Sequence, residues 1–446
     1  MDRGAHLLAR PVSQARAGAA PRVAVVGAGW SGLAAAVEAT QRGAQVTVFE
    51  MGQRAGGRAT SSLHQKSLWL DNGQHILIGA YRDTLRLMAQ VGVNERDGLV
   101  RLPLCLAYPS GDGLKLPRGP ALPAFLWAVL NWQGMPWSAR WSLLRMATGW
   151  QLKGFRCAPS LTVAQLCQSA HPRIWQDLIE PLCVAALNTP ADQASAQVLL
   201  TVLKDALFGP AGSADLLLPK LPLAQLLPEP ALRWLQDKGA VLHTGRRVQH
   251  LTANPGQDAG WLVEGEPFDR VVLACSAAEA ARLTAGIHPA WSGRAAAMRY
   301  QPIITVWLRG PTSGWPQAMM ALRAGDDAPA QFGFDLAQLG GEAGLYALVV
   351  SGAASWVDQG AQAAAEAVRR QMAAAFVNDA AWSTERTEVL AVRTEKRATF
   401  ACTPGLDRPG MLISAGLVAA GDYLAGPYPA TLEGAVRSGL AAARSL

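Results

Sequence analysis

Residues 22–32 read RVAVVGAGWSG, and this stretch decides the fold. Val and Ala fill positions 23–26, as in a short buried strand. A Gly-x-Gly-x-x-Gly turn occupies 27–32, and residues 33–40 have the composition of a helix. Residues 44–50, AQVTVFE, read as a second strand. The order strand, tight turn, helix and strand predicts the start of a parallel α/β sheet.

The three glycines of this turn have different physical tasks. Gly27 allows the tight turn, Gly29 lets the backbone approach a pyrophosphate, and Gly32 lets the helix pack on the strand. Glu50 ends the second strand, where a carboxylate can accept hydrogen bonds from ribose hydroxyls. A Gly-rich turn without function is the alternative. The turn therefore predicts a dinucleotide site formed by Gly27, Ala28, Gly29, Trp30, Ser31 and Gly32.

Two polar segments follow Glu50. Residues 54–58, RAGGR, place two glycines between arginines, which suits a backbone that passes close to a diphosphate. A solvated turn is the alternative for this segment. Residues 71–75, DNGQH, gather polar groups between apolar runs, as beside a flavin ring, and His75 is either structural or catalytic. We expect cofactor contacts from Arg54, Gly56, Gly57, Arg58 and Gln74.

A fourth segment lies near the C-terminus. Gly421-Asp422-Tyr423 precedes a helix that we expect over 431–443. The N-terminus of this helix would stabilise negative charge on a reduced flavin, and Asp422 would accept hydrogen bonds from ribityl hydroxyls. We therefore expect Gly421, Asp422, Thr431 and Leu432 to contact the cofactor.

These four segments, in this order, resemble the FAD-dependent amine oxidase and phytoene desaturase superfamily. The resemblance spans nearly the whole chain and implies FAD as the cofactor. No Cys or His is clearly placed for covalent flavin attachment, so we expect non-covalent FAD. Arg247-Val248 is similar to the strand that holds the adenine side of FAD in that superfamily, so Val248 joins the expected cofactor residues. The FAD-binding motifs of the superfamily map onto Gly27, Gly29, Gly32, Glu50, Gly56, Gly57, Arg58, Gly421 and Asp422.

Within the superfamily, residues 71–81 and the segment GPYPATLEGAV resemble the squalene-associated desaturases, which are hydroxysqualene dehydroxylases. This resemblance implies a C30 hydroxylated isoprenoid as substrate, squalene as product and an electron donor that reduces the flavin. The leaving hydroxyl needs an acid, for which His75 and Tyr423 are the candidates.

Three other functions stay open. A flavin amine oxidase would place a Lys near the flavin, and residues 300–308 contain none. A carotenoid desaturase or a protoporphyrinogen-type oxidase would share the fold and the flavin. A non-catalytic FAD-binding redox module would not need the Trp- and Leu-rich stretch at 100–235, which suits a long apolar pocket.

A chain of 446 residues is too long for one simple core, so we expect two domains. The expected fold class is α/β, with a Rossmann-like FAD-binding domain of the GR2 type and an interleaved substrate domain of mixed α+β structure. We assign 21–100, 236–298 and 400–446 to the FAD-binding domain, 101–235 and 299–399 to the substrate domain, and 1–20 to a flexible tail.

Local patterns predict the remaining elements. Helical patterns dominate 100–235, and strand patterns return near 240. We expect one small sheet segment from 240–243, 261–264 and 270–274, further strands at 300–308, 344–351 and 411–415, a helix at 361–377, and a Gly-rich loop at 416–429.

The bulk composition limits the partners. The net charge is +7, but the basic residues are scattered, so we expect no nucleic acid partner. The six cysteines form no Cys-x-x-Cys pair, so we expect neither a metal site nor a disulfide framework. No stretch has the roughly 18 apolar residues of a spanning helix, so we expect a cytoplasmic protein, soluble or peripheral on the inner face of the cell membrane. Residues 121–150 mix five Trp with Arg140 and Arg145, as a membrane-surface helix or a core helix pair would.

Overall fold

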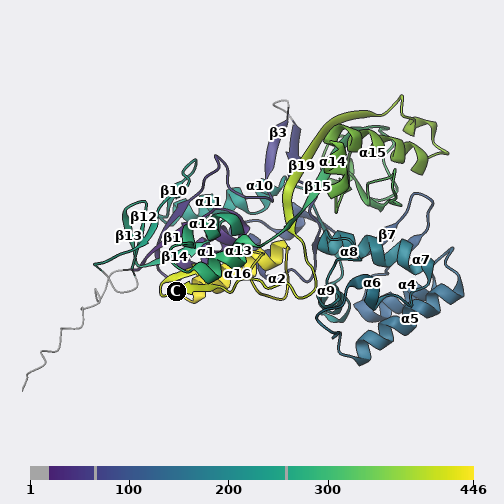
Figure 1. Ribbon diagram of the computed structural model, residues 1–446. Coiled ribbons are helices and arrows are strands. Elements are labelled where there is room, and N and C mark those ends of the chain that lie inside the picture. Colours follow the sequence, from purple (N-terminus) through teal and green to yellow (C-terminus); the bar gives the residue numbers. More distant parts are fainter. Residues whose placement is uncertain (1–19, 65–67, 257–259) are drawn as a thin grey trace, which may run out of the picture.

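The computed structural model describes residues 20–64, 68–256 and 260–446. The tail expected at 1–20 lies, except for Ala20, outside these residues. A six-stranded sheet forms the centre of one half of the molecule (Figure 1). Its strands, in spatial order, are β10 (Val241–His243), β2 (Gln45–Phe49), β1 (Arg22–Val26), β14 (Arg270–Leu273), β21 (Leu417–Ala419) and β20 (Leu412–Ser414).

The first five strands of this sheet run parallel, and β20 is antiparallel to β21. Helix α1 (Trp30–Gln41) follows β1 directly and packs against α16 (Leu432–Arg444) and α11 (Pro228–Asp237). Nine of the twelve residues of α1 are buried. Several of them are Ala, whose small side chains allow close packing of α1 against its neighbours. The expected α/β class is thereby confirmed.

Two expectations about strands were wrong. The expected loop at 416–429 contains β21, which has three residues and is buried only because β14 and β20 flank it. The strands near 240–274 do not form one segment, because β10 and β14 belong to the main sheet. A separate antiparallel sheet contains β11 (Leu251–Ala253), β12 (Trp261–Val263) and β13 (Glu266–Phe268).

A five-stranded antiparallel sheet forms the second half of the molecule, with α14 (Ala354–Gln359) and α15 (Ala361–Ala375) packed against it. The strands at 300–308 and 344–351 and the helix at 361–377 are found close to their expected bounds, whereas the 13-residue strand β19 was not expected. The order is β16 (Met319–Ala321), β17 (Phe332–Asp335), β18 (Leu345–Val350), β15 (Tyr300–Arg309) and β19 (Glu388–Phe400).

A helical lobe lies beside this second sheet, at the lower right of Figure 1. A π-helical turn, Trp175–Ile179, leads into α8 (Glu180–Leu187). A short hairpin of β7 (Cys105–Ala107) and β8 (Gly113–Lys115) precedes the lobe. The other helices are α4 (Ala121–Leu130), α5 (Trp137–Leu152), α6 (Val163–Leu166), α7 (Pro172–Ile174) and α9 (Ala196–Phe208).

A third group of elements connects the halves. Strands β5 (Leu77–Ile78), β9 (Leu216–Pro219) and β6 (Leu99–Leu102) form one small sheet. Since β9 and α11 pack with elements near the N-terminus, we propose that the substrate segment of the chain ends near 215 rather than at 235. The remaining elements here are β3 (Ser61–His64), β4 (Leu68–Asp71), α2 (Arg82–Gln90), α3 (Glu95–Gly98) and α10 (Leu223–Leu226). Helices α12 (Ala277–Thr284) and α13 (Pro289–Ala296) pack against each other in the half that contains the six-stranded sheet.

Candidate active site

A cavity of about 910 Å³ runs from the Gly-rich turn after β1 to the helical lobe. His75 and Tyr423 line it, together with most of the expected cofactor residues. Ala28, Gly32 and Arg54 do not. The expected cofactor residues in its wall are Gly27, Gly29, Trp30, Ser31, Glu50, Gly56, Gly57, Arg58, Gln74, Val248, Gly421, Asp422, Thr431 and Leu432.

The glycines of the turn have the geometry that a bound dinucleotide requires. Gly27 has φ +107°, and a Cβ on it would lie 2.6 Å from the carbonyl oxygen of Ala274. A Cβ on Gly32 would lie 1.9 Å from the carbonyl oxygen of Gly27, so the start of α1 packs tightly on the turn. Around Gly29 the nearest atom to such a Cβ is the Cα of Gly57, at 3.9 Å. Gly29 therefore leaves a backbone-lined space beside the helix N-terminus, where a pyrophosphate would accept hydrogen bonds.

Glu50 stands at the end of β2, beside this space. Its Oε2 accepts a hydrogen bond from the Ala28 amide and its Oε1 accepts one from the Gly52 amide, each at 2.7 Å. A carboxylate has about four acceptor positions, so two amides leave capacity for ribose hydroxyls. The hydrogen bonds from these two backbone amides fix the Glu50 carboxylate at the point where the cavity passes the end of β2.

Arg58 and Asp422 bring the second and fourth segments together. The Arg58 guanidinium donates to Asp422 Oδ1 at 2.5 Å and to the carbonyl oxygen of Ala398 at 2.9 Å. Arg54, the other arginine of the segment, lies with its guanidinium 5.7 Å from the ring centre of Trp69. Of the two arginines, Arg58 is thus the one that faces the cavity.

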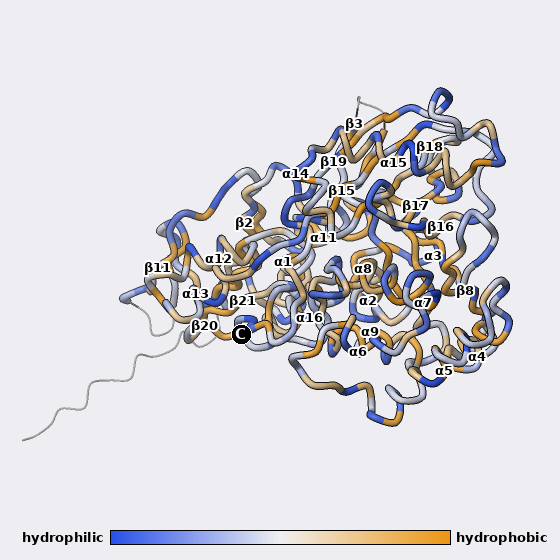
Figure 2. Tube along the Cα trace, turned by 45° about the vertical axis from the view of Figure 1, so that its right-hand side comes forward, coloured by the Kyte–Doolittle hydropathy of each residue, from blue (hydrophilic) through white to orange (hydrophobic). Residues whose placement is uncertain are grey.

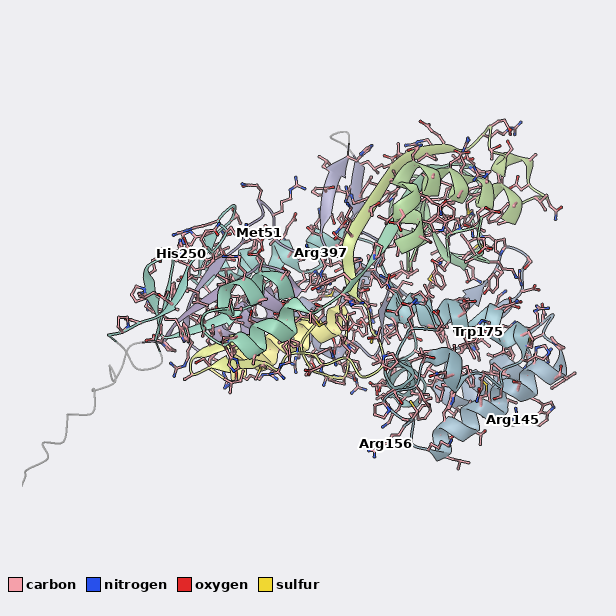
Figure 3. All side chains as sticks on the ribbon, in the orientation of Figure 1. Met51, Arg145, Arg156, Trp175, His250 and Arg397 are labelled. Atoms are coloured by element: carbon pink, nitrogen blue, oxygen red, sulfur yellow. The ribbon has the colours of Figure 1, made fainter. Side chains whose placement is uncertain are left out.

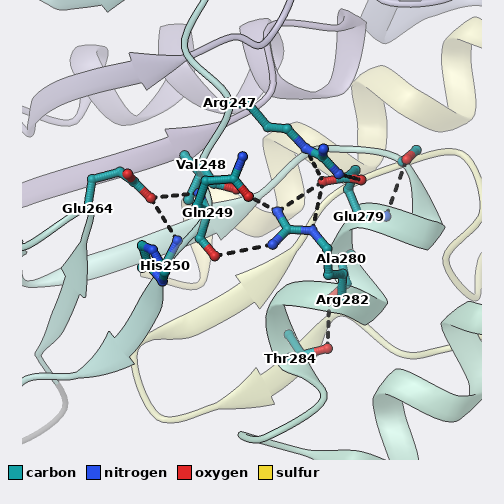
Figure 4. A network of polar contacts seen from close by, with 10 residues as sticks. Arg247, Val248, Gln249, His250, Glu264, Glu279, Ala280, Arg282 and Thr284 are labelled. Atoms are coloured by element: carbon teal, nitrogen blue, oxygen red, sulfur yellow. Dashed lines mark hydrogen bonds and ion pairs between the residues drawn. The ribbon is translucent and has the colours of Figure 1, made fainter.

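The segment around Val248 is held by α12 (Figure 4). Arg282 donates to the carbonyl oxygen of Val248 at 2.6 Å and to that of Gln249 at 3.2 Å. Glu279 accepts from both Arg282 and Arg247, and the closest distance is 2.6 Å, to Arg247. These side chains fix the backbone of 247–249 against the cavity without any strand partner. The sequence indicated Val248 but not Arg282, since a single Arg on a helix carries no pattern.

His75 lines the cavity on the turn that follows β4. Its Nδ1 lies 3.2 Å from the carbonyl oxygen of Gly73, and a carbonyl only accepts, so Nδ1 carries the proton. Burial lowers the pKa of His75 to about 4. The hydrogen bond to Gly73 opposes this shift, and the nearby charge of Arg58 adds to it. At neutral pH the ring is therefore uncharged, with Nε2 as an acceptor. This weighs against an imidazolium acid and favours His75 as a hydrogen-bond acceptor.

Tyr423 and the start of α16 form another part of the wall. Burial raises the pKa of Tyr423 well above its usual value, so the phenol keeps its proton. Its hydroxyl is buried and has no hydrogen-bond partner among the described residues. Thr431 caps α16, and its hydroxyl accepts from the Gly434 amide at 2.9 Å. The helix therefore begins as expected and presents its N-terminus to the cavity.

The half of the cavity in the helical lobe is apolar. Leu, Phe, Ile, Val and Ala side chains from four helices and from β17 and β18 make up most of its wall. Three residues of β15 also face it, Tyr300, Ile303 and Thr305, and none of them is a Lys. Sequence patterns did not identify these residues, because alternation on a strand does not reveal which face meets the cavity. Representative lining residues of the lobe are Leu122, Phe125, Leu143, Leu178, Leu182, Leu199, Val202 and Leu203.

Asn188 lies where the apolar half meets the polar half. It ends α8 with φ +45° and donates to the carbonyl oxygen of Gln301 and to the Thr399 hydroxyl, at 3.2 and 2.9 Å. Its side-chain oxygen accepts from the Gly352 amide at 2.6 Å. The side chain thus ties the lobe to β15 and β19.

Comparison with known sequences identifies the family of the chain. The pattern of flavin containing amine oxidoreductases matches residues 30–446 of the chain. The chain belongs to this family. It is an FAD-dependent oxidoreductase. We propose that the Gly-rich turn, Glu50 and the Arg58–Asp422 pair, which line one cavity, would hold the FAD dinucleotide. The expectations of an FAD cofactor and of a redox enzyme are therefore confirmed.

Individual relatives of this flavoprotein cover nearly its whole length. It is 28% identical to the hydroxysqualene dehydroxylase of Zymomonas mobilis, over 94% of this chain and 97% of the relative. It is also 28% identical to the hydroxysqualene dehydroxylase of Rhodopseudomonas palustris, with the same coverage. Among solved structures, an oxidoreductase from Methanosarcina mazei matches with a TM-score of 0.73 at 17% identity, over 95% of this chain and 100% of that chain. The structural match supports the fold.

Proposed function

We propose that this flavoprotein is a hydroxysqualene dehydroxylase, which removes the hydroxyl of a C30 isoprenoid alcohol to give squalene. The observation that carries the proposal is a cavity with a polar cofactor end and a long apolar end. The apolar end suits an isoprenoid chain, because burial of its methylenes and double bonds stabilises the complex by about 25 cal/mol per Å². Two dehydroxylases that match over nearly their full length support the same substrate class.

The reaction consumes one hydride and one proton and releases water. Reduced FAD, when bound, would supply the hydride, after an electron donor outside this chain has reduced it. An allylic hydroxyl leaves as water once an acid protonates it, and the hydride then reaches the carbon that bore the hydroxyl. The apolar lobe would orient the isoprenoid substrate. It would also exclude other water from the allylic cation that remains when the hydroxyl leaves.

His75 and Tyr423 remain the candidate polar groups for the hydroxyl. With Nδ1 protonated toward Gly73, the Nε2 of His75 would accept a hydrogen bond from the substrate hydroxyl and orient it. Tyr423 keeps its phenolic proton, so it would serve as the donor if its buried hydroxyl reaches the substrate. We propose these as separate roles that mutation can distinguish.

The residues of β15 at the cavity disfavour an amine substrate. A Lys near the flavin is expected in several amine oxidases, and here Ile303 and Thr305 face the cavity instead. Carotenoid-type substrates would use the same apolar wall, so assays must separate the two.

Anaerobic reduction and substrate addition test the proposal directly. We would reduce the purified FAD-loaded protein, add hydroxysqualene without oxygen, and follow the flavin spectrum and the product by mass spectrometry. The expected result is reoxidation of one flavin per squalene formed. If the reduced flavin stays reduced with hydroxysqualene but reoxidises with another substrate, the dehydroxylase assignment is lost.

Two variants then assign the roles. Tyr423→Phe should bind FAD normally and slow reoxidation if Tyr423 donates the proton. His75→Gln keeps a donor for the Gly73 carbonyl, and it should mainly raise KM if His75 orients the hydroxyl. A His75→Gln variant that is as active as wild type would remove His75 from the mechanism.

A further inference from the structure

An apolar surface with basic residues covers the outer edge of the helical lobe. Several large hydrophobic side chains of α4 and α5 are exposed, among them Trp127 (54%), Trp141 (65%) and Leu152 (84%). The α4–α5 hairpin lies at the lower right edge of the molecule in Figures 1 and 2, far from the six-stranded sheet. We call this surface the α4–α5 face, and its exposed hydrophobic residues are Leu126, Trp127, Leu130, Trp137, Trp141 and Leu152.

The exposed residues of α5 follow helical spacing. Trp137, Trp141, Arg145, Thr148 and Leu152 stand three or four residues apart, so they share one side of the helix. The opposite side of α5 is buried against the lobe. A helix that buries one side and exposes Trp and Leu on the other has an unpartnered apolar stripe.

The segment that carries this stripe has charges of one sign, and Asp112, which lies beside the hairpin turn at Gly134, is 3.8 Å from Arg323. Residues 113–176 contain no Asp or Glu. Figure 3 labels Arg145 and Arg156 on the lobe, and both are exposed, as is Lys153. A segment that exposes Trp, Leu and several cations and contains no acid of its own complements a layer of anionic headgroups over acyl chains. The basic residues of the segment are Lys115, Arg118, Arg140, Arg145, Lys153, Arg156 and Arg173.

The cavity wall reaches the same face. Leu126, Thr148 and Gln151 are exposed and also line the cavity that leads to the flavin site. A shallow surface hollow next to it shares Leu144 and Thr148 with the cavity wall. A ligand that leaves a bilayer at this face would therefore enter the cavity without crossing water.

We propose that the α4–α5 face docks on a bilayer of anionic lipid and that the apolar substrate passes from the bilayer into the cavity between α4 and α5. The proposal rests on the proposed function only for the identity of the substrate. Docking itself follows from the exposed stripe, the acid-free segment and the position of the cavity wall. No helix within the described parts of the chain is long and apolar enough to span a membrane, so the docking would be peripheral.

Vesicle co-sedimentation with the FAD-loaded full chain tests the docking without any substrate. The probes are vesicles of phosphatidylcholine alone and of phosphatidylcholine with phosphatidylglycerol, at low and high salt. We expect binding to the anionic vesicles, loss of most of it in high salt, and a blue shift of Trp fluorescence on binding.

Two sets of variants identify the surface. Arg145→Glu/Lys153→Glu/Arg156→Glu should weaken binding at least tenfold, since each cation near an anionic surface contributes to attraction. Trp137→Ser/Trp141→Ser should reduce the fluorescence shift, to which Trp127 still contributes, and weaken binding. Arg140 is left in place because it donates to the carbonyl oxygens of Trp132 and Met135 and so holds the hairpin turn. The matched control, Arg96→Glu/Arg233→Glu/Lys238→Glu, makes the same change in charge at exposed sites outside the lobe and should bind like wild type.

Three results would overturn the proposal. Equal binding to neutral and anionic vesicles would mean that the face does not recognise anionic lipid. Equal weakening by the control variant would mean that the bound surface is not the α4–α5 face. The third result is a wild-type dimer that the Trp137→Ser/Trp141→Ser variant converts to a monomer. The dimer result would identify a second copy of this chain as the occupant. Failure of the squalene assay would leave the docking result intact, because the vesicle experiment contains no substrate.

Discussion

Arg58 donates a hydrogen bond to Asp422 at 2.5 Å, and so joins two segments that lie 364 residues apart in the sequence. The side chain of Asp422 is buried, whereas that of Arg58 is partly exposed. Asn72 extends the connection, since its side-chain amide donates to the carbonyl oxygen of Arg58 at 2.9 Å. Three of the four segments that the sequence singled out thus meet at one residue, Arg58, through its guanidinium group and its backbone carbonyl.

Asp422→Ala should destabilise the protein and weaken FAD binding, because it leaves Arg58 without its carboxylate. We expect a coupling energy of about 1–2 kcal/mol between the two residues, less than for a fully buried pair because Arg58 is partly exposed. A double-mutant cycle with Arg58→Ala, measured by urea unfolding of the FAD-free protein, gives this number. Additive effects would mean that the pair does not hold the segments together.

Gly29→Ala should separate cofactor binding from folding. The added Cβ meets no atom of the chain within 3.8 Å, so the free energy of unfolding should change by about 1 kcal/mol or less. The same Cβ would occupy the space that we assign to the pyrophosphate, so FAD affinity should fall at least tenfold in a fluorescence titration. Gly293→Ala, in α13 with open space around it, is the control and should bind FAD normally. Unchanged affinity in Gly29→Ala would place the pyrophosphate elsewhere.

Arg282→Ala tests the network that supports the adenine side. Loss of its two bonds to the carbonyl oxygens of Val248 and Gln249 should loosen the backbone of that segment. We expect FAD to bind about tenfold more weakly, which corresponds to about 1.4 kcal/mol. Arg294→Ala, on the next helix, removes only an exposed contact to Asp407 at 4.0 Å and should leave affinity unchanged.

The sequence indicated most residues that line the polar half of the cavity, because local geometry determines their positions. A Cβ at position 27 or 32 would clash with backbone atoms, so only glycine fits there. The spacing of these glycines in the sequence therefore indicates the turn. The position of Glu50 in the sequence could be predicted because the first helix and the second strand have a typical length in this motif. That length sets the distance between the turn and the carboxylate.

The substrate half could not be predicted in the same way. Ile303 and Thr305 face the cavity only because β19 pairs with β15 in one register, which no local pattern specifies. Strand β21 is three residues long and depends on β14, a partner more than 140 positions away in the sequence, for its place in the sheet. Arg282 and Asn188 act through contacts with distant backbone, which leave no periodic signal.

His75 should make the protein less stable in acid. Burial lowers its pKa to about 4 in the folded state, whereas the unfolded chain takes up the proton near 6.5. Stability is therefore lost as the pH falls from about 6.5 toward 4, by up to about 3 kcal/mol. His75→Gln should remove this contribution, so the difference in unfolding free energy between wild type and variant should change by up to about 3 kcal/mol between pH 6.5 and 4, measured by urea unfolding of the FAD-free protein. A variant with the wild-type slope would mean that His75 is not buried in its neutral form.

Asp71 should have the opposite effect on stability. Burial raises its pKa from 3.8 to about 6, against the hydrogen bonds that it accepts from the Ser61 hydroxyl and the Leu223 amide and against the charge of Arg393. The folded protein therefore holds a proton that the unfolded chain has already lost, so stability falls as the pH rises from about 4 through 6, by up to about 3 kcal/mol.

Asp71→Asn removes this charge and keeps an oxygen that can accept from Leu223. The variant should equal wild type in stability near pH 4 and exceed it at pH 8, measured by urea unfolding of the FAD-free protein. Because the His75 and Asp71 slopes oppose each other between pH 4 and 6, wild type should show little net change there, and each single variant should expose the other slope. If Asp71→Asn is destabilised equally at every pH, the carboxylate is needed as a hydrogen-bond acceptor and its buried charge does not limit stability.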